Sequence, residues 1–140
     1  MNCCESSSKN TENTKYGYTK KVSLPFDETI TKVKEALGAE GFGVLTEIDV
    51  KATMKSKLDV DYDNYIILGA CNPQFAHKAL QAEKEIGLLL PCNVIVYEDN
   101  SEVYVSSILP SSAMSIVENN ELSEISKEVE EKLKSVIDSL

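Results

Sequence analysis

The sequence predicts an α+β fold in which a five-stranded sheet is covered by helices. Three observations lead to this prediction. Residues 65–71 and 92–97 are short runs rich in Ile, Leu and Val, as in strands buried on both faces. Residues 121–140 repeat apolar side chains at helical spacing, which indicates an amphipathic helix. Runs of strands with helices on one face are typical of the α+β class.

The first half of the chain contains two predicted strands and two predicted helices. Residues 16–24 alternate in polarity, which suits a first strand. A helix over 26–38 follows, because Asp27 and Glu28 favour the positive end of a helix dipole. The remaining segments are a strand over 43–50, a short helix over 51–58 and an acidic loop over 59–64.

The centre of the chain carries both a helix start signal and a helix stop signal. Asn72 is a good N-cap because its side-chain oxygen accepts a backbone N–H, and Pro73 suits the first helical position. Gly87 ends the helix that we predict over 73–86. After it we expect a strand over 92–97, a hairpin turn at 99–100, a strand over 102–108, a loop or single turn over 110–114 and the helix over 121–140.

Four strings of this sequence resemble the DUF302 family. They are Gly41-Phe-Gly-Val-Leu-Thr-Glu-Ile-Asp49, Ile67-Leu-Gly-Ala-Cys-Asn-Pro73, Ala76-x-x-Ala-Leu80 and Gly87-Leu-Leu-Leu-Pro-Cys-Asn-Val-x-Val-Tyr-Glu98. The resemblance covers residues 16–140 and implies a single DUF302-like domain there. It implies a mainly antiparallel sheet with the TATA-binding-protein-like order β-α-β-β-β-β-α and an additional inserted helix. It implies no established activity.

Composition limits the partners that this chain can take. Its 140 residues carry a formal net charge of −9, which argues against nucleic acid, because phosphate binding needs a basic face. It has no apolar stretch near the ~20 residues of a membrane span. Residues 1–15 are polar and are predicted to be a disordered tail.

Two localisations fit this tail. We expect a soluble cytoplasmic domain. The alternative is a bacterial lipoprotein held at the cell envelope through Cys3 or Cys4, because a Cys before a Ser- and Asn-rich tether resembles the start of a mature lipoprotein. That alternative requires an upstream signal peptide.

The candidate site lies at two Cys-Asn pairs. If the two central strands are antiparallel neighbours, as the resemblance implies, both pairs meet at one end of the sheet beside a helix N-terminus. His77 is the single histidine and faces solvent on the predicted helix, so a role there would need it to turn toward Cys71. The predicted ligand-binding residues are Gly69, Cys71, Asn72, His77, Pro91, Cys92 and Asn93.

These residues favour a non-enzymatic module that binds a small molecule or a protein partner, with a homodimer as one form of assembly. Gly and Pro geometry and two Asn amides in apolar surroundings are typical of a small pocket. The alternative is a thiol-dependent enzyme or redox sensor that uses Cys71 and Cys92, although we predict no disulfide between them. We assign no catalytic residue, metal or cofactor. Asp59, Asp61 and Asp63 lack the Gly and closing Glu of a calcium loop.

Overall fold

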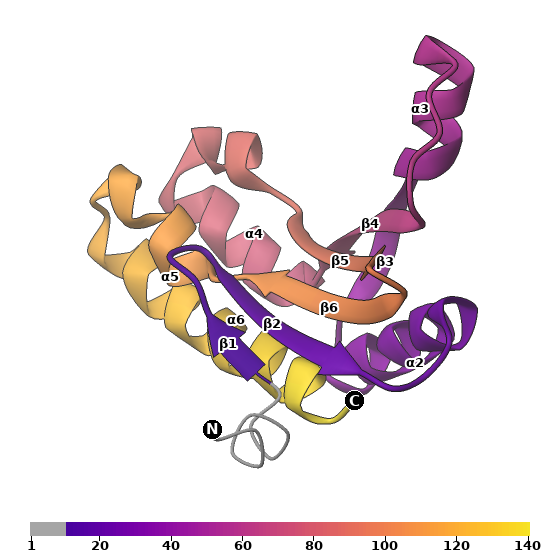
Figure 1. Ribbon diagram of the computed structural model, residues 1–140. Coiled ribbons are helices and arrows are strands. Elements are labelled where there is room, and N and C mark those ends of the chain that lie inside the picture. Colours follow the sequence, from indigo (N-terminus) through magenta and orange to yellow (C-terminus); the bar gives the residue numbers. More distant parts are fainter. Residues whose placement is uncertain (1–10) are drawn as a thin grey trace.

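The computed structural model describes residues 11–140, which form one antiparallel sheet with helices packed against it (Figure 1). The strand order is β1-β2-β6-β5-β4-β3, and each neighbouring pair is antiparallel. This arrangement confirms the predicted α+β class and strand directions. The strands are β1 (Thr11–Asn13), β2 (Gly17–Val22), β3 (Gly43–Asp49), β4 (Tyr65–Cys71), β5 (Cys92–Asp99) and β6 (Glu102–Ile108).

The helices differ in how much they contribute to the core. The long helices α2 and α6 pack under the sheet, and α4 packs against α6. Their bounds are α2 (Phe26–Ala39), α3 (Val50–Leu58), α4 (Pro73–Ala82), α5 (Pro110–Ala113) and α6 (Asn120–Asp138), with 3₁₀ turns η1 (Lys84–Leu89) and η2 (Ser115–Val117). Within residues 11–140, none of these helices is both long and apolar enough to cross a bilayer.

The short strand β1 was not predicted. Thr11–Asn13 lies inside the segment that the sequence predicts to be disordered, and it pairs antiparallel with β2. The structure places an edge strand in these three residues, where the backbone hydrogen bonds of the antiparallel ladder hold it. Residues 1–10, including Cys3 and Cys4, lie outside the described part of the chain.

The sheet has one core face and one partly exposed face. Leu68, Val94 and Val105 are fully buried under α2 and α6. Their neighbours on the strands, such as Ile67 and Ile95, are partly exposed. The prediction that the central strands are buried on both faces was therefore wrong, because the covering helices pack on one side only and successive side chains alternate.

The segment between β3 and β4 projects from the body of the domain (Figure 1). Its helix α3 has no buried residue. Asp49 Oδ1 accepts from the Ala52 N–H at 2.9 Å and caps the start, while Asp59 at φ 54° ends it. Lys55 forms ion pairs with Asp59 at 3.0 Å and Asp61 at 3.6 Å. Lys55 therefore offsets part of the negative charge of Asp59 and Asp61, two of the three aspartates compared above with a calcium loop.

Helix α4 is shorter than the predicted 73–86 segment. It ends at Ala82, Glu83 is extended at φ −151° and ψ 106°, and a 3₁₀ turn follows. Asn119 explains the early end: its Nδ2 donates to Ala82 O and to Glu83 Oε1, each at 3.2 Å. Ile86 then joins Ala79 and Leu122 in a second small core. A tertiary contact therefore overrides the local signal at Gly87.

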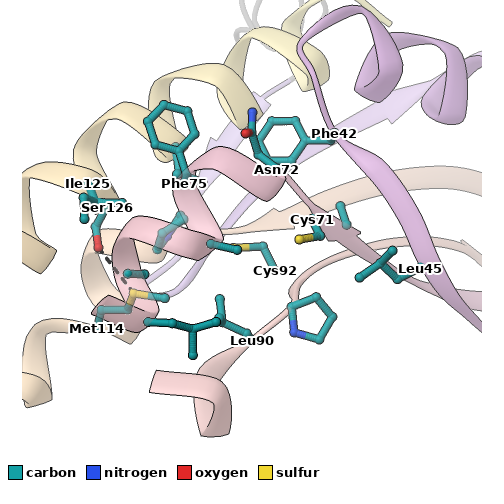
Figure 2. Close-up of a pocket in the computed structure, with 17 residues that line it drawn as sticks. Phe42, Leu45, Cys71, Asn72, Phe75, Leu90, Cys92, Met114, Ile125 and Ser126 are labelled. Carbon is teal, nitrogen blue, oxygen red and sulfur yellow. Dashed lines mark hydrogen bonds between the residues drawn. The ribbon is translucent and has the colours of Figure 1, made fainter. Parts of the chain in front are cut away.

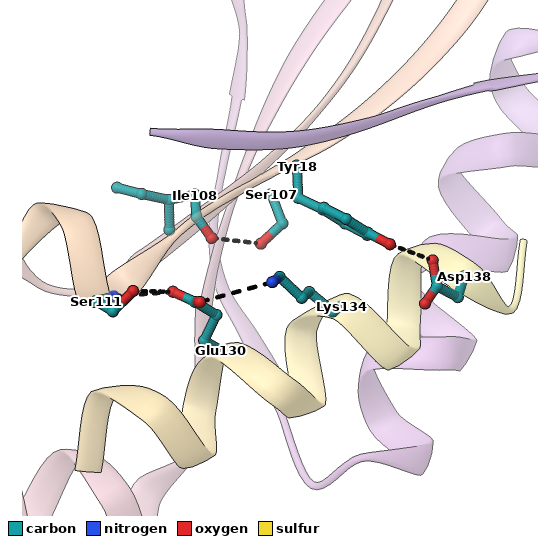
Figure 3. Close-up of polar contacts among 7 residues, drawn as sticks. All are labelled: Tyr18, Ser107, Ile108, Ser111, Glu130, Lys134 and Asp138. Carbon is teal, nitrogen blue, oxygen red and sulfur yellow. Dashed lines mark hydrogen bonds and ion pairs between the residues drawn. The ribbon is translucent and has the colours of Figure 1, made fainter. Parts of the chain in front are cut away.

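Polar contacts hold α6 against the sheet and against α5 (Figure 3). Tyr18 donates its hydroxyl to Asp138 Oδ1 at 2.8 Å. Glu130 Oε1 accepts from the Ser111 backbone N–H at 3.0 Å and from the Ser111 hydroxyl at 2.6 Å. Lys134 lies 3.7 Å from the other oxygen of Glu130. These bonds hold the two helices that carry one wall of the site described next.

Candidate ligand-binding site

An apolar cavity of about 270 Å³ lies where the ends of β4 and β5 meet α4, α5 and α6 (Figure 2). Phe42 and Leu45 close it from the β3 side, and Ile125 and Val129 close it from α6. Its polar lining side chains are Asn72 and Ser126, along with two thiols. The full lining is Phe42, Leu45, Ala70, Cys71, Asn72, Phe75, Ala76, Ala79, Leu80, Leu90, Pro91, Cys92, Pro110, Met114, Ile125, Ser126 and Val129.

The two cysteines share one end of the sheet, as predicted. Strand β4 pairs antiparallel with β5, and Ala70 lies opposite Cys92 in the register. Cys71 is the last residue of β4 and Cys92 the first of β5, and both line the cavity at this end of the sheet. Both cysteines are free, in line with the prediction that they form no disulfide.

The Cys92 thiol is held in its neutral form. Burial raises its pKa from 9.0 to about 11, and the neighbouring Cys71 adds a smaller contribution in the same direction. A thiolate is the nucleophilic form of cysteine, and a thiol with this pKa is almost wholly protonated at neutral pH. Cys92 therefore contributes a neutral, largely apolar surface with a weak S–H donor to the cavity.

Asn72 occupies the N-cap position of α4 but does not cap the helix. Its side chain makes no capping hydrogen bond, contrary to the expectation from the sequence. The amide lies beside the turn after α2 instead, and a Cβ built on Gly41 would come within 3.1 Å of Asn72 Nδ2. Gly41 has φ +87°, which only glycine adopts easily. Glycine at position 41 therefore leaves room for the Asn72 amide beside this turn.

Three of the predicted site residues do not line the cavity. Gly69 and Asn93 form a pair in the β4–β5 ladder, one residue before Ala70 and one after Cys92. Because successive strand side chains alternate, they face the opposite side of the sheet, and the two Cys-Asn pairs do not bring both amides together. His77 is exposed on α4 and stays on the solvent side, as its helical position indicated.

The α6 wall was missed in the sequence, although a signal for it exists. Ser126 stands on the apolar stripe of α6 between Leu122 and Val129 and is only 2 % exposed. A serine at a buried helical position needs a hydrogen-bond partner, which marks it for attention. Its partner is Met114, from a segment that the sequence predicts only as a loop or single turn.

The described residues contain no group of three or more His, Cys, Asp or Glu side chains placed to hold a metal. The two thiols at the cavity therefore lack companions of the kind that complete a zinc site.

The fold and this geometry define a small α+β domain with a ligand-sized apolar pocket between its sheet and its helices. Residues 18–140 match the family described as "Domain of unknown function DUF302", and the chain belongs to that family. It is similar to the crystal structure of an uncharacterized conserved DUF302 protein from Bacillus stearothermophilus, with 32 % identity and a TM-score of 0.82. The similarity covers 87 % of this chain and 95 % of that one. Among functionally curated proteins, none matches this chain.

Proposed function

We propose that this domain is a non-enzymatic module that binds a small molecule in the cavity between β4, β5, α4 and α6. The cavity itself is the observation that supports the proposal. An apolar cavity of about 150 Å³ is large enough for benzene, so about 270 Å³ suits a larger apolar group such as a substituted ring or a medium-length chain. Cys71, Asn72, Pro91 and Cys92 are the predicted site residues that would contact it.

The wall chemistry supports binding over catalysis. Phe42 and Phe75 offer ring faces or edges to an apolar ligand, and the Asn72 amide can orient one polar group. The single histidine is exposed on the solvent side of α4. Among the described residues that line the cavity with the two thiols, none is a His, Asp, Glu or Lys that could act as their base.

The test is a titration of the full chain with toluene, followed by ¹H–¹⁵N NMR. We expect saturable shifts at the amides of Ala70, Cys71 and Phe75. Ala76→Leu adds side-chain volume to the cavity wall and should weaken binding by about tenfold or more, which corresponds to ~1.4 kcal/mol or more. Gln74→Leu adds a leucine to the exposed side of the same helix and is the matched control. Shifts that stay linear in toluene, or an equal effect of both variants, would refute the proposal.

A thiol-dependent enzyme or redox sensor is the second candidate. The observation that favours it is the position of Cys71, which is half-buried and next to Cys92 at the cavity wall. The raised pKa of Cys92 argues against this thiol as a nucleophile. Alkylation of the native protein at neutral pH separates the candidates: reaction of Cys71 at the rate of an unstructured thiol or faster favours the second, and two inert thiols remove it.

We also propose that the domain forms a homodimer. Support comes from the apolar side chains on edge strand β3 and at the end of α3, with Leu45 67 % exposed and Leu58 66 % exposed. Exposed apolar groups at a sheet edge are suited to a partner of the same kind. Analytical ultracentrifugation at micromolar concentration is the check, and a mass near 15.4 kDa would exclude the dimer.

For localisation, we propose a soluble cytoplasmic domain, with attachment through a lipidated Cys3 or Cys4 as the alternative. The net charge of −9 supports the first, because an anionic bilayer surface repels an acidic protein. Cell fractionation of the natural gene product distinguishes the two, since a lipoprotein follows the membrane fraction and shifts to the detergent phase.

A further inference from the structure

A second hollow lies next to the apolar cavity and has the opposite chemistry. Its volume is about 400 Å³, and it is formed by the segment from α5 to the first turns of α6. Met114 and Ser126 line both hollows, so these two side chains lie between the apolar space and the polar space. The lining of the polar hollow is Ser111, Met114, Ser115, Glu118, Asn119, Asn120, Ser123 and Ser126.

The contact between these two side chains is weak enough to be exchanged for a ligand. Ser126 Oγ donates a hydrogen bond to Met114 Sδ at 3.4 Å (Figure 2). Among the described residues, Met114 is the hydrogen-bond partner of this buried hydroxyl. A thioether sulfur is a weak acceptor, so a ligand oxygen would be a better partner for the buried hydroxyl. Met114 packs at the edge of the small core of Ala79, Ile86 and Leu122, and its flexible, unbranched side chain can adopt another rotamer there.

We propose that the ligand is a neutral amphiphile that occupies both hollows at once. This inference rests on the proposed function of the cavity. The apolar part of the ligand fills the cavity between Phe42 and Ile125, and its polar head passes Met114 into the second hollow. At the passage, the Ser126 hydroxyl leaves the sulfur and bonds to an ether, hydroxyl or amide oxygen of the ligand.

The groups that line the polar hollow disfavour an anionic head. Ser111, Ser115 and Asn119 already bond to the protein, which leaves Asn120 and Ser123 to face a head group. Glu118 is the charged lining residue, and no Lys or Arg lines the hollow. An anionic head would meet this carboxylate without a cation to offset it, while hydroxyl and amide groups can bond to Ser and Asn.

Three probes with the full chain test the inference by ¹H–¹⁵N NMR. Toluene has no head, octyl glucoside has a neutral polyol head and octanoate has an anionic head. Octyl glucoside, below its micelle concentration, should shift the cavity amides and also those of Glu118, Asn120 and Ser123. We expect it to bind at least about tenfold more tightly than octanoate.

Ser126→Ala tests the passage between the hollows. It should weaken octyl glucoside about threefold to tenfold, the effect of one lost hydrogen bond, and leave toluene within about twofold. Ser135→Ala removes a hydroxyl from an exposed site of the same helix, where Ser135 bonds to Glu40, and should change neither affinity.

Three results would overturn the inference while the proposed function stands: glucoside shifts confined to the cavity, octanoate binding as tightly as octyl glucoside, or equal glucoside affinity in Ser126→Ala. In each of these, toluene still saturates. Absence of saturable toluene shifts overturns the proposed function, and this inference with it.

Discussion

Gly69 and Pro91 pack against each other on the outer side of the β4–β5 pair, and a Cβ on Gly69 would lie 2.8 Å from Pro91 Cγ. The same Cβ would also collide with Thr46 Oγ1 on β3. Gly69 is therefore a close-approach glycine that lets Pro91 lie over the strand. The sequence suggested this role, because a glycine inside a strand often marks a bulge or close approach, and the β3–β4 register does shift next to Gly69.

Gly69→Ala should destabilise the domain by about 1–3 kcal/mol, the usual cost of forcing an extra carbon into a packed site. The control is Gly43→Ala on β3, where an added Cβ meets nothing within 4 Å. We expect that control to be neutral or slightly stabilising, since alanine restricts the unfolded chain. Urea unfolding followed by circular dichroism measures both. Equal stabilities for the two variants would contradict the packing argument.

The Cys92 thiol should make stability fall at high pH. Its pKa is raised from 9.0 to about 11, so the folded state favours the protonated form. This contribution is complete below pH 9 and is lost as the pH rises from about 9 to 11. Two pKa units correspond to about 2–3 kcal/mol at most. Denaturant unfolding at a series of pH values should show a shallower decline in Cys92→Ala than in the natural chain.

Because other groups also titrate in this pH range, the test is the difference in slope between Cys92→Ala and the natural chain. Burial raises the pKa of Tyr65, and the bond to Glu102 raises that of Lys21. Both remain in Cys92→Ala, and part of the decline should therefore persist. An unchanged slope after removal of Cys92 would show that its ionisation is not linked to unfolding.

Asn119 connects α4 to α6, and its side chain should contribute more to the free energy of unfolding than that of Asn120. Its Oδ1 accepts from Leu122 N at 3.1 Å and caps α6, while its Nδ2 bonds to the last carbonyl of α4. Asn119→Ala removes the cap and leaves that carbonyl with one partner fewer, at a cost of about 1–2 kcal/mol. Asn120→Ala, one residue later and exposed, is the control. Guanidinium unfolding midpoints would decide, and equal midpoints would exclude a linking role.

A tyrosine ladder should stabilise the partly exposed face of the sheet. The Tyr97 ring stacks on Tyr65 at 5.5 Å and on Tyr104 at 5.3 Å between centroids. Aromatic pairs contribute about 0.5–1.5 kcal/mol each beyond burial. Tyr97→Leu should therefore cost about 1–3 kcal/mol in thermal or urea unfolding. Tyr62→Leu loses one tilted contact at 6.4 Å and should cost less than half as much, while the reverse order would refute the ladder.

Much of the fold could be predicted from local patterns. Alternating or continuous apolar runs placed β2, β3, β4, β5 and β6 within about two residues of their ends, because strand and helix periods depend on nearest neighbours along the chain. The amphipathic stripe of α6 was clear for the same reason. The resemblance to DUF302 added the strand directions, which a connection of this length between β4 and β5 leaves open.

The candidate site was predicted only in part, for a reason visible in its residues. Cys71 and Cys92 were assigned to the site because each lies at the end of a predicted strand. The antiparallel register of β4 and β5 brings both to the same end of the sheet. Asn93 was assigned to the same site, but strand alternation turns it to the other face. Ser126 and Met114 were not assigned: the serine on the apolar stripe of α6 was a signal for the first, but neither segment alone shows that its partner is Met114.

The sequence by itself determined the element types, the α+β class and the location of two thiols at strand ends, since these follow from local periodicity and caps. Only the tertiary structure decided that α4 ends at Ala82 and that the Asn72 side chain does not cap this helix. It alone also decided that an apolar cavity meets a polar hollow at Met114 and Ser126. These features depend on contacts between segments far apart in the chain, where packing and hydrogen bonds outweigh the few tenths of a kcal/mol to about 1 kcal/mol of local preference.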